Sequence, residues 1–182
     1  MRLFTAIDIP EQIRHELGGA IARLRESAVA RWNHPDKLHI TTKFIGEWPE
    51  PRLEELKAGL SALPPRAPLS IHIRELGFFP NPRSPRVFWC GIDAPGLDAL
   101  AAATDRGCAA LGIASENRPF SPHLTLARIK ERVNLEPLRE AMAALPDRDF
   151  GKFEVRGFFL YLSKLRPTGS VYTKLAEFPF SK

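Results

Sequence analysis

The sequence predicts an α+β fold of two lobes, with two small, mostly antiparallel sheets flanking a central cleft and helices on the outside. Three observations support this class. Segments with the apolar period of strands alternate with segments that have the period of helices. The pattern His-x-Thr occurs at His39 and again at His123, 84 residues later in a chain of 182. One helix and two strands are expected after each copy, which indicates an internal duplication.

The first half of the chain alternates strand and helix and then ends in a hairpin. Pro10 suits the first turn of a helix, and Pro64-Pro65 ends a later one. The segment at 80–86 is rich in Pro and Arg and can only be a loop. The expected elements are a strand at 2–9, a helix at 10–28, the first His-x-Thr strand ending at residue 46, a helix at 49–63 and strands at 69–79 and 87–93.

The second half is expected to repeat this order. The predicted elements are a helix at 95–111, the second His-x-Thr strand from residue 123, a helix at 134–145 and strands at 152–165 and 170–180. Short Pro-rich stretches are the only breaks, and they suit rigid turns better than flexible linkers. We therefore expect residues 1–182 to form one domain of two pseudosymmetric lobes that can exchange strands.

Composition limits the class of protein and the partners. The net charge of +5 and a pI near 9.5 favour an anionic partner, although composition alone does not identify it. No apolar run approaches the roughly 20 residues that span a bilayer, and the N-terminus does not resemble a signal peptide. Cys90 and Cys108 have no close cysteine partner. We therefore predict a cytoplasmic, monomeric protein with no membrane contact and with reduced, buried thiols.

The two His-x-Thr copies lie in apolar, β-branched runs. His39 and Thr41 should therefore share one face of a strand, as should His123 and Thr125. Because the pKa of histidine is about 6.5, one ring can accept a proton while the other donates one. Cleavage of a phosphodiester needs both functions, on opposite sides of the phosphorus. Threonine hydroxyls can donate to the phosphate oxygens, so the pattern predicts acid-base chemistry on a phosphate.

Arg128 is a candidate for supplying positive charge to the bound phosphate. It follows His123 by five residues, so strict alternation would place it on the opposite face of the strand. This role therefore requires a β-bulge, a twist or the end of the strand.

The remaining histidines and the possibility of a metal are judged by their context. His15 is expected on an exposed helix face, and neither His34 nor His72 belongs to a paired pattern. The sequence has no H-x-H or H-E-x-x-H motif. We therefore leave these three histidines out of the site and expect neither a metal nor another cofactor.

With these residues identified, five segments resemble one known group of enzymes. They are, in order, "RLFTAIDIP", "LHITTKFIGE", "RVFWCGI", "FSPHLTLAR" and "LYLSKLRPTGSVYTKL". The chain resembles the 2H phosphoesterase superfamily, and within it the RNA 2',3'-cyclic phosphodiesterases formerly described as 2'-5' RNA ligases. The resemblance implies that His39 donates a proton to the leaving oxygen and His123 activates water, while Thr41 and Thr125 bind phosphate oxygens. Thr42 stands where the family usually has leucine, and its side chain is expected to point away from the cleft.

The resemblance also implies the substrate. A 2',3'-cyclic phosphate at an RNA end or on a nucleotide would be opened to a 2'-phosphomonoester without a metal. Arginines in the loops are candidates for tracking an RNA backbone, namely Arg83, Arg86 and Arg118. Most aromatic residues are instead expected in the core, including Phe44, Phe88 and Phe158.

Two rival functions stay open on the sequence. The same pair of histidines could join RNA ends through a 2'-5' bond, since the reverse reaction uses the same groups. Alternatively, the chain could be a non-catalytic module that binds RNA ends or nucleotides. The two histidines argue against the second rival, because binding alone needs cationic groups rather than a titrating pair.

Overall fold

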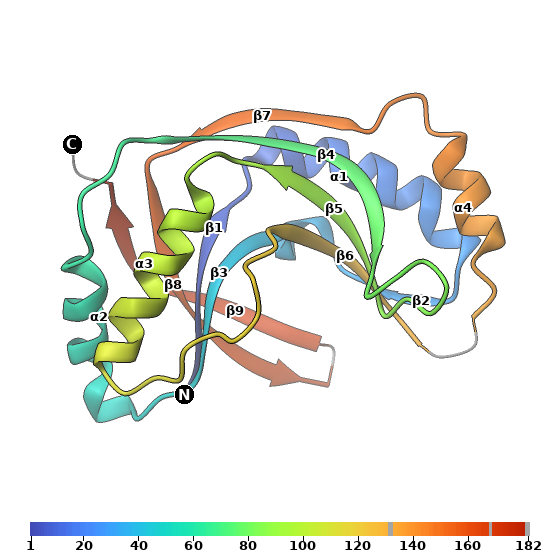
Figure 1. The fold of residues 1–182 in the computed structure, drawn as a ribbon. Coiled ribbons are helices and arrows are strands. Elements are labelled where there is room, and N and C mark those ends of the chain that lie inside the picture. Colours follow the sequence, from blue (N-terminus) through green and yellow to red (C-terminus); the bar gives the residue numbers. More distant parts are fainter. Residues whose placement is uncertain (131–132, 168, 181–182) are drawn as a thin grey trace.

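Two antiparallel sheets form the framework of the computed structural model, which describes residues 1–130, 133–167 and 169–180 (Figure 1). The first sheet has the strand order β3-β1-β8-β9 and the second has the order β2-β6-β5-β4-β7. The strands are β1 (Arg2–Asp8), β2 (Ala30–Trp32), β3 (His39–Glu47), β4 (Leu69–Phe79), β5 (Val87–Asp93), β6 (His123–Ile129), β7 (Asp149–Val155), β8 (Gly157–Arg166) and β9 (Gly169–Pro179).

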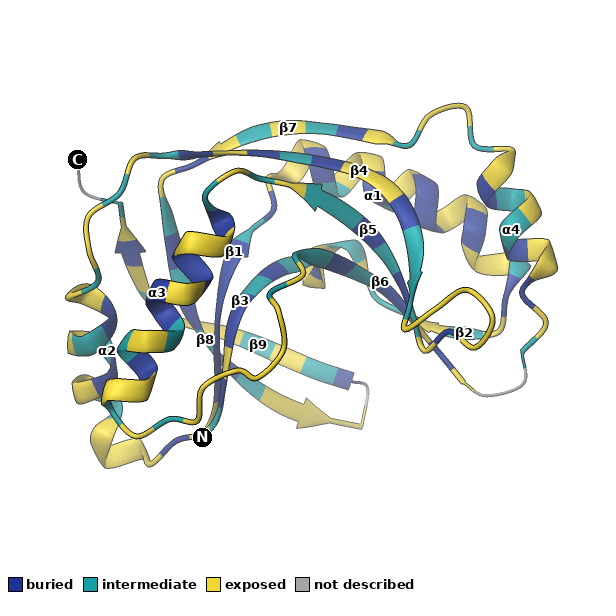
Figure 2. Cartoon of the chain, in the orientation of Figure 1, coloured by how far each residue is buried: buried dark blue, intermediate teal, exposed yellow. Residues whose placement is uncertain are grey.

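The α-helices of the described residues lie on the outside of the sheets, as the sequence predicts. They are α1 (Glu11–Leu24), α2 (Leu53–Ser61), α3 (Leu97–Ala110) and α4 (Glu136–Ala143). Helices α2 and α3 pack against each other and on the first sheet, and α1 and α4 pack together on the side of the second sheet. Each helix buries one apolar stripe and exposes the opposite side (Figure 2).

The chain crosses between the sheets in a way that follows the duplication. Helix α1 lies in the chain between β1 and β3, which both belong to the first sheet, but it contacts β7 of the second sheet. Helix α3 connects β5 to β6 of the second sheet but contacts β3 of the first. The internal duplication predicted from the two motifs is therefore confirmed in the order strand, helix, motif strand, helix of each half.

Two predicted elements differ from the structure, and one observed strand is not predicted. The single strand expected at 152–165 is two strands, β7 and β8, which belong to different sheets. Polar and apolar residues alternate from Lys152 to Arg156, and the apolar run 158–160 follows after Gly157 alone, so the pattern resembles one continuous strand. The helix expected to reach residue 28 ends at Leu24 and continues as a short 3₁₀ turn, and β2 is a strand that the pattern does not predict.

The expectation for the cysteines is confirmed. Cys90 and Cys108 are both free thiols in the buried core. Burial raises the pKa of both, and that of Cys108 to about 11, so these thiols are unreactive at neutral pH. Separately, none of the described helices combines the length and apolar character that crossing a membrane requires.

Candidate active site

His39 is the first residue of β3, and its ring is held by the backbone just before the strand. Its Nδ1 lies 2.8 Å from the carbonyl oxygen of Lys37. Because a carbonyl can only accept a hydrogen bond, Nδ1 carries the hydrogen and Nε2 is left to exchange protons. Among the described residues no group is hydrogen-bonded to this Nε2.

His123 is the first residue of β6 and has the same arrangement. Its Nδ1 lies 2.8 Å from the carbonyl oxygen of Ser121, which again is two residues upstream. Across the described part of the chain, its Nε2 also has no hydrogen-bond partner. The duplicated sequence thus fixes the same tautomer twice, with Nε2 as the atom available for acid-base chemistry.

A β-bulge occurs at the same place in both motif strands. In β3, Thr41 and Lys43 pair with consecutive residues of β1, which leaves Thr42 as the extra residue. In β6, Thr125 and Ala127 pair with consecutive residues of β5. An extra residue reverses the alternation of faces that follows it.

Arg128 could share the face of His123 only if a bulge, a twist or the strand end broke the alternation of β6, and the bulge in β6 does so. Burial along β6 alternates from His123 to Leu126 and then repeats a buried residue, so Arg128 is exposed on the side of His123 and Thr125. In β3 the same shift places Phe44 on the side of His39.

The bulge also makes one sequence expectation wrong. Phe44 is 62% exposed rather than in the core, whereas Phe88 and Phe158 are buried as expected. The alternating pattern alone assigns Phe44 to the buried face. The first motif therefore carries an exposed aromatic ring where the second carries Arg128.

Thr42 points away from this face, as expected. Its hydroxyl is buried and lies 2.7 Å from the hydroxyl of Thr5 on β1. A threonine pair thus replaces the apolar contact that leucine would make, and it satisfies both buried hydroxyls. Thr41 and Thr125 are only partly buried and lie two residues after their histidines.

One segment between β2 and β3 links the two motifs. The side chain of Asn33 donates to the carbonyl oxygen of Thr125 at 2.7 Å, and its backbone N–H donates to that of Leu126 at 2.8 Å. Four residues later, the carbonyl of Lys37 holds His39. Strands β3 and β6 also contact each other directly. The polypeptide between residues 33 and 39 therefore sets the position of one motif strand against the other (Figure 1).

Aromatic rings surround His39 and affect its charge. The ring centroid of Phe4 lies 4.9 Å from that of His39, and the ring of Tyr172 lies edge-on at 5.0 Å. Burial lowers the pKa of His39. The hydrogen bond to Lys37 and the charge of Asp8, which pairs with His39 across β1 and β3, act in the opposite direction.

Asp8 is itself held by two residues of the β8–β9 hairpin. The Tyr161 hydroxyl donates to one carboxylate oxygen of Asp8, and the Lys174 ammonium donates to the other at 2.7 Å. Burial, with the nearby Asp8, raises the pKa of Tyr161, so the phenol stays protonated. Sequence reasoning missed this cluster, although Asp8 lies within the segment "RLFTAIDIP".

The surroundings of His123 are different. Gly91 occupies the position opposite His123 that Asp8 occupies opposite His39. The ring of Phe79 lies edge-on to the ring of His123, with 5.1 Å between the ring centroids. On its other contact, the centroid of Phe79 lies 5.2 Å from that of Trp89. A side chain at Gly77 would collide with the Trp89 ring, so this glycine lets the ring lie against the sheet.

An ion pair between a buried lysine and a partly exposed aspartate lies on the opposite face of β3. The bulge turns Lys43 to the helix side, where its ammonium lies 2.6 Å from Asp105 of α3 and 2.7 Å from the Ala114 carbonyl. Asp105 also accepts from the backbone N–H of Glu116. The hydrogen bond from Lys43 lowers the pKa of Asp105. These contacts attach the segment after α3, which leads to β6, to the first motif strand.

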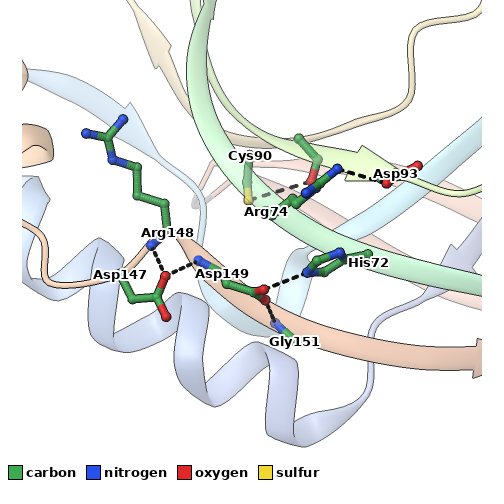
Figure 3. Close-up of polar contacts among 9 residues, drawn as sticks. His72, Arg74, Cys90, Asp93, Asp147, Arg148, Asp149 and Gly151 are labelled. Carbon is green, nitrogen blue, oxygen red and sulfur yellow. Dashed lines mark hydrogen bonds and ion pairs between the residues drawn. The ribbon is translucent and has the colours of Figure 1, made fainter.

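The histidines left out of the site lie elsewhere. His15 and His34 are exposed. His72 on β4 pairs with Asp149 on β7 at 2.8 Å, beside an ion pair of Arg74 with Asp93 (Figure 3). Within residues 1–130, 133–167 and 169–180, no three His, Cys, Asp or Glu side chains are grouped closely enough to hold a metal ion.

The loop arginines named from the sequence are in two places. Arg83 and Arg86 line a pocket of about 460 Å³ beyond the end of β6, together with Lys130 and Arg139. Arg118 is exposed in the loop before β6, where its backbone N–H donates to Glu116.

The chain matches the family model described as LigT like Phosphoesterase over residues 7–89 and 92–172. It is 36% identical to the RNA 2',3'-cyclic phosphodiesterase of Methanocaldococcus jannaschii, over 97% of this chain and 99% of that protein. The protein of the same name from Thermus thermophilus is also 36% identical, over 98% of this chain and 89% of its own length.

Two crystal structures share the fold over nearly the whole of each chain. TT0787 of Thermus thermophilus superimposes with a TM-score of 0.79 at 33% identity, covering 99% of this chain and 98% of its own. E. coli LigT complexed with 3'-AMP has a TM-score of 0.81 at 29% identity, covering 100% of this chain and 98% of its own.

Proposed function

The chain belongs to the LigT-like phosphoesterase family of the 2H superfamily, and from this membership we propose that it hydrolyses RNA 2',3'-cyclic phosphate ends to 2'-phosphomonoesters. The observation that carries the proposal is the repeated geometry at His39 and His123. Each ring has Nδ1 fixed by a backbone carbonyl and Nε2 available. Relatives that cover nearly the whole chain are named RNA 2',3'-cyclic phosphodiesterase, and E. coli LigT is complexed with 3'-AMP.

In the proposed reaction, water attacks the phosphorus and the bond from phosphorus to the 3' oxygen breaks. His123 accepts a proton from the attacking water through Nε2, and His39 donates a proton through Nε2 to the departing 3' oxygen. The product has a 2'-phosphate and a free 3'-hydroxyl. Positioned proton transfers of this kind each contribute roughly 10² to 10⁴ in rate. No metal or other cofactor takes part in these steps.

The proton donor must be protonated when substrate is bound. Burial lowers the pKa of His39 in the free protein, which disfavours this state. A cyclic phosphate anion beside the ring would favour the imidazolium, as the charge of Asp8 already does. We therefore expect His39 to gain its proton together with the substrate.

Other residues on the same faces would bind the substrate. The hydroxyls of Thr41 and Thr125 would donate to the two non-bridging oxygens, and Arg128 would supply the positive charge. Phe44 presents an exposed ring on the side of His39. We propose that it stacks on the terminal base, since base stacking on aromatic rings tolerates any base.

The mechanism requires one copy of the chain and no second domain. Both motifs lie on the same polypeptide, so residues 1–182 can supply the whole site as a monomer and a single domain of two lobes. The two unpaired thiols suit a reducing compartment. We therefore propose that the enzyme acts in the cytoplasm.

The proposal is tested with a 2',3'-cyclic nucleotide in excess chelator, using wild type, His39→Ala and His123→Ala. We expect activity to persist with chelator and to fall by about 10² to 10⁴ in each variant. His15→Ala, on the exposed face of α1, should keep the wild-type rate. Full activity in either site variant, or loss of wild-type activity with chelator, would contradict the mechanism.

The same preparation separates the rival functions. A cyclic-phosphate RNA is incubated with an RNA that has a free 5'-hydroxyl, and hydrolysis is compared with joining. Faster joining would favour the ligase, and binding with neither reaction would favour a non-catalytic module.

A further inference from the structure

Two arginines face each other on neighbouring strands beside the motif of His123. Arg31 on β2 pairs directly with Arg128 on β6. Residues directly opposite in an antiparallel pair project to the same face. Arg31 is exposed and therefore lies on the face that the bulge gives to Arg128, His123 and Thr125.

Like charges in directly opposite positions destabilise a sheet. No carboxylate in the described residues forms an ion pair with Arg31 or Arg128. By contrast, Arg74 elsewhere in the same sheet is paired with Asp93 (Figure 3). Because this arginine pair has no carboxylate partner among the described residues, it is suited to an external anion. Guanidinium groups bind phosphate through paired hydrogen bonds.

A third cation from the linking segment lies at the same place. A Cβ atom at Gly169, at the start of β9, would lie 3.5 Å from Nη2 of Arg31 and 3.8 Å from Nζ of Lys37. The two cationic groups thus approach the same point of the hairpin. Lys37 is also the residue whose carbonyl holds His39. The cationic groups of Arg31, from the second sheet, and of Lys37, from the linking segment, therefore both approach β9 of the first sheet.

We propose that Arg31 and Lys37, which lie beside Arg128, bind the phosphodiester on the 5' side of the cyclic phosphate, while Arg128 contacts the cyclic phosphate itself. This inference rests on the proposed function and narrows its substrate class. A cyclic phosphate is at the 3' end of its RNA, so every additional phosphate extends from it in the 5' direction. The site therefore selects RNA oligonucleotides over cyclic mononucleotides, which have no such phosphate.

The test compares two substrates with the same terminal base: 2',3'-cyclic AMP, and a short RNA oligonucleotide that ends in adenosine 2',3'-cyclic phosphate. Arg31→Gln and Lys37→Gln are measured beside Arg23→Gln, which removes an exposed arginine from α1. We expect Arg31→Gln to raise KM for the oligonucleotide about tenfold and KM for cyclic AMP less than twofold. The slope of log KM against log salt for the oligonucleotide should also fall by about 0.7 for each phosphate that a variant no longer binds.

Two results would overturn the inference. One is an equal loss on both substrates in Arg31→Gln, and the other is an oligonucleotide KM no different from that of Arg23→Gln. Retained turnover of cyclic AMP shows that a variant is folded. If the wild type hydrolyses neither substrate, the proposed function itself fails, and this result is distinct from a selective failure of Arg31.

Discussion

Opposite His39 the neighbouring strand carries Asp8, whereas opposite His123 it carries Gly91. The backbone around the two histidines is otherwise the same, with a carbonyl two residues upstream and a bulge three residues downstream. After the bulge, the first strand has Lys43 and Phe44 where the second has Ala127 and Arg128. Duplication thus preserves the backbone geometry around each histidine, while divergence of the neighbouring side chains distinguishes the two halves.

The largest effect on stability is expected at Lys43. Its counterpart in the second motif strand, Ala127, has no charge, whereas Lys43 depends on its ion pair with Asp105. Lys43→Ala removes a cation whose side chain is only 5% exposed and leaves the Asp105 carboxylate without its ion pair. We expect the free energy of unfolding to fall by about 2–3 kcal/mol in a denaturant titration. Lys57→Ala, which breaks an exposed pair with Glu54, should cost less than about 1 kcal/mol.

The Lys43 prediction also has a pH dependence. The pKa of Asp105 is lower in the folded protein than its ordinary value. The contribution of the ion pair is therefore present above the unfolded pKa and is lost as pH falls through the folded pKa. The stability difference between Lys43→Ala and wild type should shrink in acid. A difference that grows in acid would show that the pair is not its source.

The threonines test whether the two halves contribute equally to phosphate binding. Thr41→Val and Thr125→Val each remove one hydroxyl with little change in shape. We expect kcat/KM for the cyclic nucleotide to fall about tenfold in each. Thr42→Val is the matched control, since its hydroxyl bonds to Thr5 in the core and its loss should reduce stability rather than activity. A loss confined to one half would mean that the phosphate is bound by one strand only.

Each motif strand has one exposed residue after its bulge, Phe44 in β3 and Arg128 in β6, and a substitution of Phe44 tests what the aromatic ring contributes. Phe44→Leu keeps an apolar side chain but removes the ring, and we expect KM for the cyclic nucleotide to rise about fivefold with kcat nearly unchanged. Val29→Ala changes another exposed apolar residue and should have no effect. A fall in kcat at constant KM would instead indicate that Phe44 acts on His39 through Phe4, whose ring it contacts.

Much of the fold could be predicted from periodicity and proline positions. The strands β4 and β5 begin and end where the alternation predicts. The separation of β7 from β8 could not be predicted, because both have the pattern of strands and the choice of sheet depends on distant partners, Leu69 for Val155 and Phe178 for Phe158. Local sequence contains no information about such pairings.

The candidate site is predictable where residues repeat and unpredictable where they converge from distant positions. His39, His123, Thr41 and Thr125 could be found from the motif alone. Arg128 could be placed on their face only conditionally, because a bulge is a property of two paired strands. Asp8, Tyr161 and Lys174 come from three different strands and have no shared pattern in the sequence.

The smallest expected effect is also the one that assigns the roles of the histidines. Asp8→Asn keeps the size of the side chain and removes the charge that opposes the lowered pKa of His39, so that pKa should fall further. If His39 is the acid, the basic limb of the bell-shaped profile of kcat/KM moves to lower pH. If His39 is the base, the acidic limb moves instead.

Two further variants make this assignment robust. Lys174→Met removes the cation that neutralises Asp8, so it should shift the same limb in the opposite direction. Asp93→Asn changes an exposed carboxylate on the second sheet and should leave both limbs in place. The pKa of His39 should also be followed directly by NMR. A profile unchanged in Asp8→Asn would mean that the carboxylate positions the β8–β9 hairpin through Tyr161 and Lys174 and does not influence the proton on His39.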